Sequence, residues 1–275
     1  MENKWLSLSV YADKVNQDII SSYFDLYSLG NHFNEDHITM YFSIDNKNKA
    51  EGILLGIREK YKIIYEWNTV ESENWMNNWK DFFKPVNIDD KVLIIPDWDE
   101  AEYESDFIIK ICPAMAFGTG HHESTQLMIR HMMDYKIEQY DTLLDLGAGT
   151  GILSILAKKM GVNNVSGIEI DSVCEENFYK NCQLSDVSGI DFKISDVHSY
   201  NNYNYDVILA NIDKINIVKI LNTYQNSDSK AMMILAGLLD SDLDDIKDLI
   251  TDCYIDNMTQ DNEWISLVIK KDSLK

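Results

Sequence analysis

The second half of the chain alternates short apolar runs with segments of helical spacing. Residues 152–160 (ILSILAKKM) predict a helix that Gly161 ends. The apolar runs predict strands at 142–145, 165–169, 190–195, 206–212 and 231–238. Strands that alternate with helices form a parallel sheet covered on both faces. Residues 253–258 and 264–269 flank a polar turn and predict a closing antiparallel hairpin.

The first 67 residues have a different pattern. Residues 6–10 (LSLSV) alternate apolar and polar side chains, as in a half-buried strand, and residues 15–27 place apolar side chains at helical spacing. Further segments are a helix near 49–58 and strands at 38–44 and 61–67. This mixture predicts a small α+β domain.

The connection between the two regions carries large aromatic residues. Trp75, Trp79 and Phe83 recur every fourth residue, which predicts one face of a helix that Pro85 ends. Such a stripe favours packing over ligand binding. The chain is therefore divided into a small domain at 1–67, a helical linker at 68–84 and a large domain at 85–275.

The composition is strongly acidic, with a formal charge of −22. Direct binding to nucleic acid is not expected, because it needs a cationic surface. An acidic surface can steer a basic protein toward the chain, or it can simply aid solubility, and both interpretations stay open. No apolar run approaches the roughly 20 residues that span a bilayer, and the N-terminus lacks a secretion signal. A cytoplasmic protein without a membrane segment is expected.

Neither the cysteines nor the histidines predict a metal site. The four cysteines form no Cys-x-x-Cys pair, and we expect free thiols without a catalytic role. They are Cys112, Cys174, Cys182 and Cys253. His121 and His122 are neighbours in sequence, and such neighbours rarely coordinate one ion together.

A glycine-rich segment at 145–151 (DLGAGTG) lies where a strand turns into a helix. Gly147 and Gly149 allow the backbone to approach a ligand, and the helix start offers unpaired N–H groups. The spacing is D-x-G-x-G-x-G, whereas dinucleotide enzymes use G-x-G-x-x-G. The carboxylate of Asp145 would repel a pyrophosphate and attract an ammonium. S-adenosyl-L-methionine (AdoMet) carries an ammonium and no phosphate.

Polar residues follow the predicted strands. Glu169 ends the second strand, where doubly wound folds place the acid that binds ribose hydroxyls. Asp196 follows the third strand and is a candidate acceptor for the adenine amino group. Asn211 ends the fourth strand, within reach of a reacting centre. The alternatives are ordinary exposed acids and a buried, satisfied asparagine. A second glycine turn at 117–125 leads to Ser124 and Thr125, whose hydroxyls are further cofactor candidates.

Several of these motifs together resemble the ribosomal protein L-11 methyltransferase family. The glycine loop alone is typical of methyltransferases in general, whereas the FGTG turn, the ANI strand end and the linker tryptophans are specific. The similar segments are AFGTGHHEST (116–125), LLDLGAGTGILSILAKKMG (143–161), GIEID (167–171), ILANI (208–212), LAGLL (235–239), WMNNWKDFFKPV (75–86), IPDW (95–98) and EWISLVIKK (263–271).

The resemblance implies a Rossmann-like seven-stranded class I methyltransferase domain behind a small N-terminal α+β domain of ferredoxin-like shape. It implies AdoMet binding by Thr125, Gly147, Glu169 and Asn211, to which the loop spacing adds Gly149. It also implies methyl transfer to lysine or N-terminal amines of ribosomal protein L-11, a basic protein substrate. We expect the chain to act as a monomer.

Two departures from the family pattern stand out. The family commonly has Thr-His-Pro-Thr-Thr where this chain has His121-His122-Glu123-Ser124-Thr125. The strands predicted for the small domain are one fewer than the βαββαβ pattern requires. Three alternatives to this function stay open: a nicotinamide oxidoreductase, a methyltransferase of a different protein lysine, and a non-catalytic AdoMet-binding protein.

Overall fold

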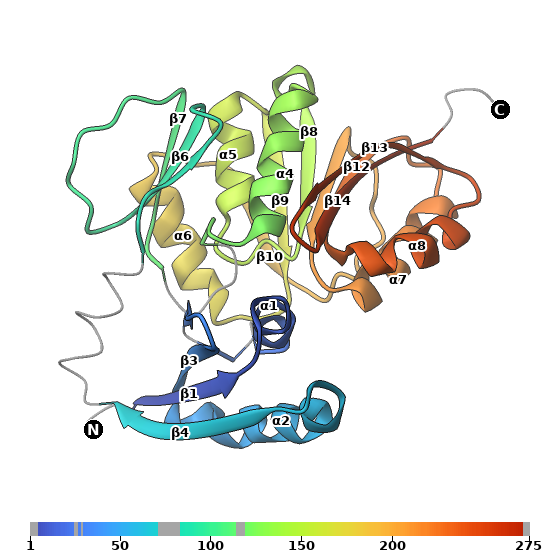
Figure 1. The fold of residues 1–275 in the computed structure, drawn as a ribbon. Helices are drawn as coiled ribbons and strands as arrows, with labels where there is room; N and C mark the ends of the chain where they lie inside the picture. Colours follow the sequence, from blue (N-terminus) through green and yellow to red (C-terminus); the bar gives the residue numbers. More distant parts are fainter. Residues whose placement is uncertain (1–4, 25–26, 29, 71–82, 114–118, 272–275) are drawn as a thin grey trace. The chain divides into compact units, whose positions relative to one another are not determined.

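The computed structural model describes residues 5–24, 27–28, 30–70, 83–113 and 119–271 (Figure 1). The described residues divide into two compact units, of which the first ends at Lys84 and also includes Pro113. The second contains the other described residues from Pro85 onward. Most of the predicted linker helix, including Trp75 and Trp79, lies outside the described residues.

The first unit has the βαββαβ order of a ferredoxin-like domain. Its main elements are β1 (Trp5–Tyr11), α1 (Lys14–Ser22), β2 (Gly30–Phe33), β3 (His37–Ser43), α2 (Lys47–Tyr61) and β4 (Ile64–Val70). The four strands pair in the order β2-β3-β1-β4, antiparallel throughout. The two helices share a core with one face of this sheet, in which Leu8 and Met40 meet Ile20 and Leu54. This arrangement is consistent with the ferredoxin-like expectation.

The prediction that this domain is one strand short was wrong. The missed strand, β2, contains only Gly30-Asn31-His32-Phe33, which has no apolar alternation. It is held in the sheet by antiparallel pairing with β3, where Gly30 lies opposite Tyr41 and Phe33 opposite Ile38. Pairing with the neighbouring strand β3 leaves no periodic signal in so short a segment.

The second unit is an α/β domain with a small additional sheet. Its elements are β5 (Val86–Ile88), β6 (Val92–Pro96), β7 (Phe107–Ile111), α4 (Glu123–Asp134), β8 (Thr142–Leu146), α5 (Ile152–Met160), β9 (Asn164–Glu169), α6 (Cys174–Leu184), β10 (Ile190–Ile194), β11 (Val207–Asn211), α7 (Lys214–Gln225), β12 (Met232–Leu239), α8 (Leu243–Leu249), β13 (Tyr254–Asp261) and β14 (Trp264–Lys270). Among the described helices, none is long and apolar enough to cross a membrane.

The large sheet has seven strands in the order β10-β9-β8-β11-β12-β14-β13. The first five are parallel, whereas β14 runs antiparallel to both β12 and β13. The chain builds outward from β8 to β10 and then returns to place β11 on the other side of β8. The predicted parallel sheet, its five strands and the closing hairpin are confirmed, with strand ends that differ by one to three residues.

A three-stranded sheet was not predicted. In it β5 runs antiparallel to β6, and β6 runs parallel to β7. These strands contain only three to five residues each. The apolar runs VLII (92–95) and FII (107–109) were the available signal for two of them, because β8 and β11 are no longer than β6 and β7.

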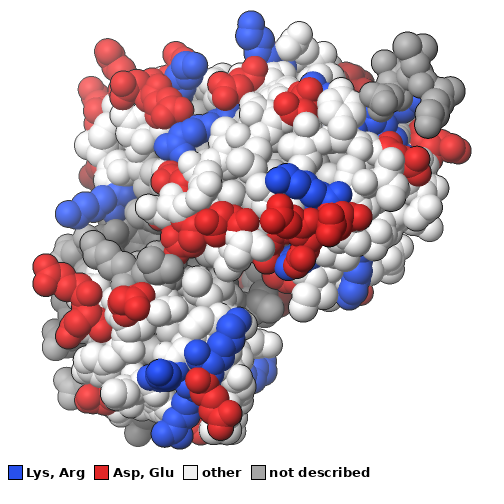
Figure 2. All heavy atoms as spheres, turned by 45° about the vertical axis from the view of Figure 1, so that its right-hand side comes forward, with Lys and Arg blue, Asp and Glu red and all other residues white. Residues whose placement is uncertain are grey.

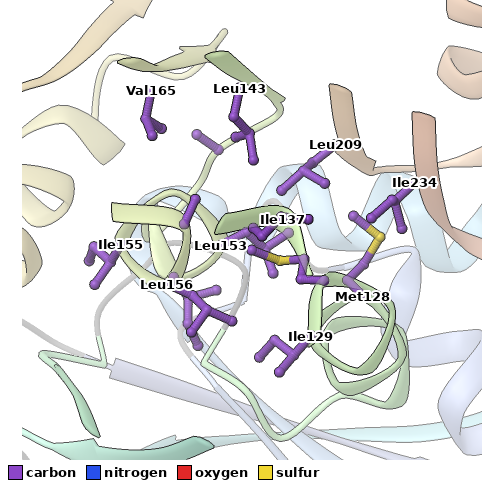
Figure 3. Packing of buried hydrophobic residues seen from close by; sticks show 14 of the residues in the cluster. Met128, Ile129, Ile137, Leu143, Leu153, Ile155, Leu156, Val165, Leu209 and Ile234 are labelled. Atoms are coloured by element: carbon purple, nitrogen blue, oxygen red, sulfur yellow. The ribbon is translucent and has the colours of Figure 1, made fainter. Parts of the chain in front are cut away.

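Two apolar clusters hold the layers of the second unit together. On one face of the large sheet, α4 and α5 pack through residues such as Met128 and Ile155 (Figure 3). Helix α6 joins the same cluster through Phe178. On the other face, α7 and α8 pack through residues such as Leu221 and Ile246. Both faces of the central strands are therefore buried, as their unbroken apolar runs predict.

A bulge in β12 brings two strand ends into close contact. The register against β14 shifts between Leu235 and Leu238, and Gly237 in this interval has φ +84°. A Cβ atom on Gly237 would lie 2.2 Å from the backbone oxygen of Ile212, the residue after β11. A side chain at position 237 would therefore displace the chain that follows Asn211.

We predict that Gly237→Ala lowers the free energy of unfolding by about 3 kcal/mol or more, because overpacking adds to backbone strain. Gly189→Ala is the matched control, since Gly189 also has positive φ but its Cβ would have no neighbour within 4 Å. We expect the control to lose only about 1–2 kcal/mol, from strain alone. Urea denaturation of both variants measures the difference, and equal losses would contradict the close contact.

Candidate active site

The carboxyl ends of β8, β9, β10 and β11 lie along one edge of the large sheet, where doubly wound folds bind ligands. The glycine loop, residues 147–151, connects β8 to α5 at this edge. Gly147 has φ +79°, and a Cβ atom there would lie 2.4 Å from Cγ2 of Ile212. The loop therefore passes close to the chain that leaves β11, and only glycine fits at position 147.

Glu169 holds the glycine loop through its carboxylate. The backbone N–H of Gly149 donates to Oε2 of Glu169 at 3.0 Å. The other oxygen, Oε1, accepts from the N–H groups of Ile170 at 2.8 Å and Asp171 at 3.0 Å. Only 8% of Glu169 is exposed. The structure thus brings three of the predicted site residues together: Gly147 and Gly149 in the loop and Glu169 beside it.

Asp145 lies beneath the loop. It is buried within β8, and its Oδ2 accepts a hydrogen bond from Ser154 Oγ at 2.7 Å. Burial raises the pKa of Asp145 to about 6, and the nearby charge of Glu169 acts in the same direction. That Asp145 selects an ammonium over a pyrophosphate stays a prediction.

Thr125 and Asn211 form a second buried polar pair. Asn211 Nδ2 donates to Thr125 Oγ1 at 3.2 Å, which connects the end of β11 to the first turn of α4. Both residues are buried. Among the described residues, Oδ1 of Asn211 has no hydrogen-bond partner although it is buried. A buried acceptor without a partner costs free energy, so this oxygen is a candidate to receive a hydrogen bond from a bound group.

Asp196 lies on the surface two residues after the end of β10. Its Oδ1 accepts from the N–H of His198 at 2.9 Å, which stabilises the turn after the strand. The side chain is therefore at the predicted edge of the sheet, but its contact with a ligand stays a prediction.

Three exposed apolar residues at the same edge were not predicted. Ile170 is 63% exposed, Val173 55% and Ile194 40%. Ile194 ends β10 directly opposite Glu169 of β9, so these side chains follow neighbouring strand ends. Ile170 stands between two acids in GIEID, and this apolar residue in a polar turn was the available signal.

The remaining sequence predictions concern the histidines, the cysteines and the glycine turn at 117–125. His122 caps α4, and its Nδ1 accepts from the N–H of Ser124 at 3.2 Å. The described residues contain no group of three side chains suited to hold a metal ion. All four cysteines are free. Phe117 lies outside the described residues.

The strand order, the glycine loop after β8 and the acid at the end of β9 define a class I AdoMet-dependent methyltransferase. Comparison with known proteins is more specific, because the family model of ribosomal protein L11 methyltransferases matches residues 9–272. The chain belongs to this family.

Individual relatives agree. A ribosomal protein L11 methyltransferase of Clostridium botulinum strain Eklund 17B is 30% identical over 244 residues, which cover 86% of this chain and 76% of the relative. One of Porphyromonas gingivalis is 33% identical, over 74% of this chain and 71% of the relative. The crystal structure of the ribosomal protein L11 methylase of Lactobacillus delbrueckii subsp. bulgaricus superposes with a TM-score of 0.61 at 24% identity, covering 69% of this chain and 99% of that one. This last likeness supports the fold.

The buried histidine at the start of α4 generates a prediction of pH-dependent stability. Burial lowers the pKa of His122 from 6.5 to about 4, so the folded protein holds its ring neutral. This contribution to stability is complete above about pH 6.5 and is lost as the pH falls toward 4, by roughly 3 kcal/mol. Asp145 acts in the opposite direction, because its raised pKa favours the folded state as the pH falls.

The measurement is therefore a difference between two proteins. His122→Asn keeps a side-chain acceptor for the cap and does not titrate between pH 4 and 7. The free energy of unfolding of the variant relative to wild type should rise as the pH falls from about 6.5 to 4. A difference that stays constant over this range would show that His122 is not held neutral.

Proposed function

We propose that this methyltransferase transfers methyl groups from AdoMet to lysine or N-terminal amines of ribosomal protein L11. The observation that carries the proposal is the joined pair of Glu169 and the glycine loop, with the unpartnered acceptor of Asn211 nearby on β11. Family membership supports the substrate. A methyltransferase of a different protein lysine and a non-catalytic AdoMet-binding protein are the alternatives.

The residues at this edge fit the parts of AdoMet. The absence of side chains at Gly147 and Gly149 lets the backbone approach the amino acid part. The Glu169 carboxylate accepts hydrogen bonds from the ribose hydroxyls, in addition to those it accepts from the backbone. Ile170 offers an exposed apolar surface to the adenine ring, and Asp196 accepts from its amino group. The buried carboxylate of Asp145 below the glycine loop would repel a pyrophosphate, which argues against a nicotinamide cofactor.

Thr125 and Asn211 complete the cofactor site at the end where the methyl group is transferred. AdoMet supplies an electrophilic methyl group on a sulfonium, and the protein positions a neutral amine in line with it. A free lysine has a pKa of about 10.4, so burial in a site that excludes water must favour its neutral form. Oδ1 of Asn211 accepts an N–H of this amine, which leaves the lone pair directed at the methyl group. We assign no general base.

We predict that Glu169→Ala weakens AdoMet binding by roughly 1.5–3 kcal/mol, the range of hydrogen bonds to a charged group. Glu175→Ala is the control, because Glu175 is an exposed acid in the first turn of α6. Calorimetry on both variants, each shown to be folded, measures the effect. Wild-type affinity in Glu169→Ala, or tight NAD binding by the wild-type protein, would refute the assignment.

The acidic charge is unevenly divided between the two parts of the chain. Residues 1–84 contain 9 Lys and Arg against 13 Asp and Glu, whereas residues 85–275 contain 15 against 33. Figure 2 shows acidic side chains gathered in a band on one face of the larger unit. Long-range attraction of a basic protein therefore comes mainly from the methyltransferase domain. We propose that the small domain, residues 1–67, contributes recognition at short range.

We predict that removal of residues 1–67 leaves AdoMet affinity nearly unchanged, because Thr125, Gly147, Glu169 and Asn211 all remain. Methylation of purified ribosomal protein L11 should fall by orders of magnitude, because the target amine loses its positioning. The truncated protein keeps most of the acidic charge, so slow methylation cannot be attributed to lost steering.

The comparison uses labelled AdoMet and a truncated protein shown to be folded by circular dichroism. Raising the salt concentration should slow association of the full chain with its substrate more than it speeds dissociation. If the truncated protein methylates as fast as the full chain, the small domain does not recognise the substrate.

A further inference from the structure

Helix α6 provides hydrogen bonds along the outer edge of β7. This strand ends its three-stranded sheet, so one of its edges faces α6 instead of another strand. Ser185 Oγ accepts from the N–H of Lys110 at 3.0 Å and donates to the carbonyl of Lys110 at 2.9 Å. Asn181 Oδ1 accepts from the N–H of Cys112 at 2.7 Å, and Asn177 Nδ2 donates to the carbonyl of Cys112 at 2.9 Å.

The spacing of these residues explains why the side chains reach the backbone groups of Lys110 and Cys112. Asn177 and Asn181 lie in α6, and Ser185 is the residue that caps its end. The three are four residues apart, so their side chains lie on one side of the helix. Lys110 and Cys112 are two residues apart, so their backbone groups point to the same edge of the strand. All three helix side chains are at most 9% exposed. Buried polar side chains here replace the backbone of a neighbouring strand.

Of these three side chains, that of Asn181 also forms a hydrogen bond with the glycine loop. Its Nδ2 donates to the carbonyl of Thr150 at 2.9 Å, and it is fully buried. The N–H of Gly151, in the same peptide unit as that carbonyl, donates to Ala148 at 2.8 Å. This peptide unit is therefore held at both ends. Together with the bond from Gly149 to Glu169, the middle of the loop is fixed from two sides.

We propose that Asn181 is a positioning residue for AdoMet binding, which rests on the function proposed above. By fixing the Thr150–Gly151 peptide unit, it holds the backbone of the glycine loop in its binding conformation before the cofactor arrives. Without this bond, the loop has to be ordered when the cofactor binds, and that cost appears as lost affinity. The same side chain joins the loop to Cys112, at the end of β7.

The test compares two substitutions on the same face of α6. Asn181→Asp keeps the acceptor for the N–H of Cys112 but loses the donor to the Thr150 carbonyl and to Asn177 Oδ1. Ser185→Ala loses the bonds to Lys110 and does not involve the loop. The dissociation constant for AdoMet should rise about tenfold or more in Asn181→Asp and stay within about twofold of wild type in Ser185→Ala.

Two further measurements separate positioning from general destabilisation. In the protein without AdoMet, amide hydrogen exchange in a peptide covering residues 145–152 should be faster in Asn181→Asp than in Ser185→Ala or wild type. At saturating AdoMet, kcat on the substrate of the wild-type protein should stay within about twofold of wild type. If Asn181→Asp does not fold, Asn181→Ser is used, since its shorter side chain also leaves Thr150 without the bond.

Each outcome has a distinct meaning. If wild type and both variants fail to bind AdoMet, the proposed function is overturned. If wild type binds AdoMet and Asn181→Asp binds equally well with unchanged loop exchange, the positioning role is overturned. A lower kcat with an unchanged dissociation constant would also overturn it, because Asn181 would then act after binding.

Discussion

The hydrogen bond from the Gly149 N–H to the Glu169 carboxylate is the interaction on which the site depends. It joins the turn after β8 to the end of β9, and the same carboxylate holds the two following backbone N–H groups. Parallel pairing of β8 with β9 brings these ends together, and the buried core on both faces keeps the strands aligned. A carboxylate already fixed by the protein can bind a ribose without a large loss of its own freedom. The fold thus orients the ligand-binding groups before the ligand arrives.

The sequence predicted the α/β domain well, because its central strands are largely apolar runs and the segments between them have apolar residues at helical spacing. Prediction of strands failed where the segment is short or where its pairing depends on another segment of the chain. The strand Gly30–Phe33 has no alternation and depends on β3, and the three residues of β5 are too few to distinguish from a loop. The site followed the same rule. Gly147, Glu169 and Asn211 stand at strand ends and were predicted, whereas Ile170 was not.

The least predictable part of the site is the set of bonds between side chains of α6 and the backbone of β7. Asn177, Asn181 and Ser185 look like ordinary polar helix residues in the sequence, and nothing in their spacing names the strand that they meet. Their role depends on the free edge of β7, which exists only once the three-stranded sheet has formed. Local patterns reveal which residues face the core, but not which backbone a buried amide satisfies.

The division of charge and chemistry gives the two units different roles in the proposed function. The larger unit contains all the residues proposed to bind the cofactor and most of the acidic charge, while the small domain adds a separate surface. The most direct test incubates the full chain with labelled AdoMet and total ribosomal protein and identifies the labelled band. The account predicts that ribosomal protein L11 carries the label, on lysine or N-terminal amines. Label on a different protein, or no label although AdoMet binds, would contradict it.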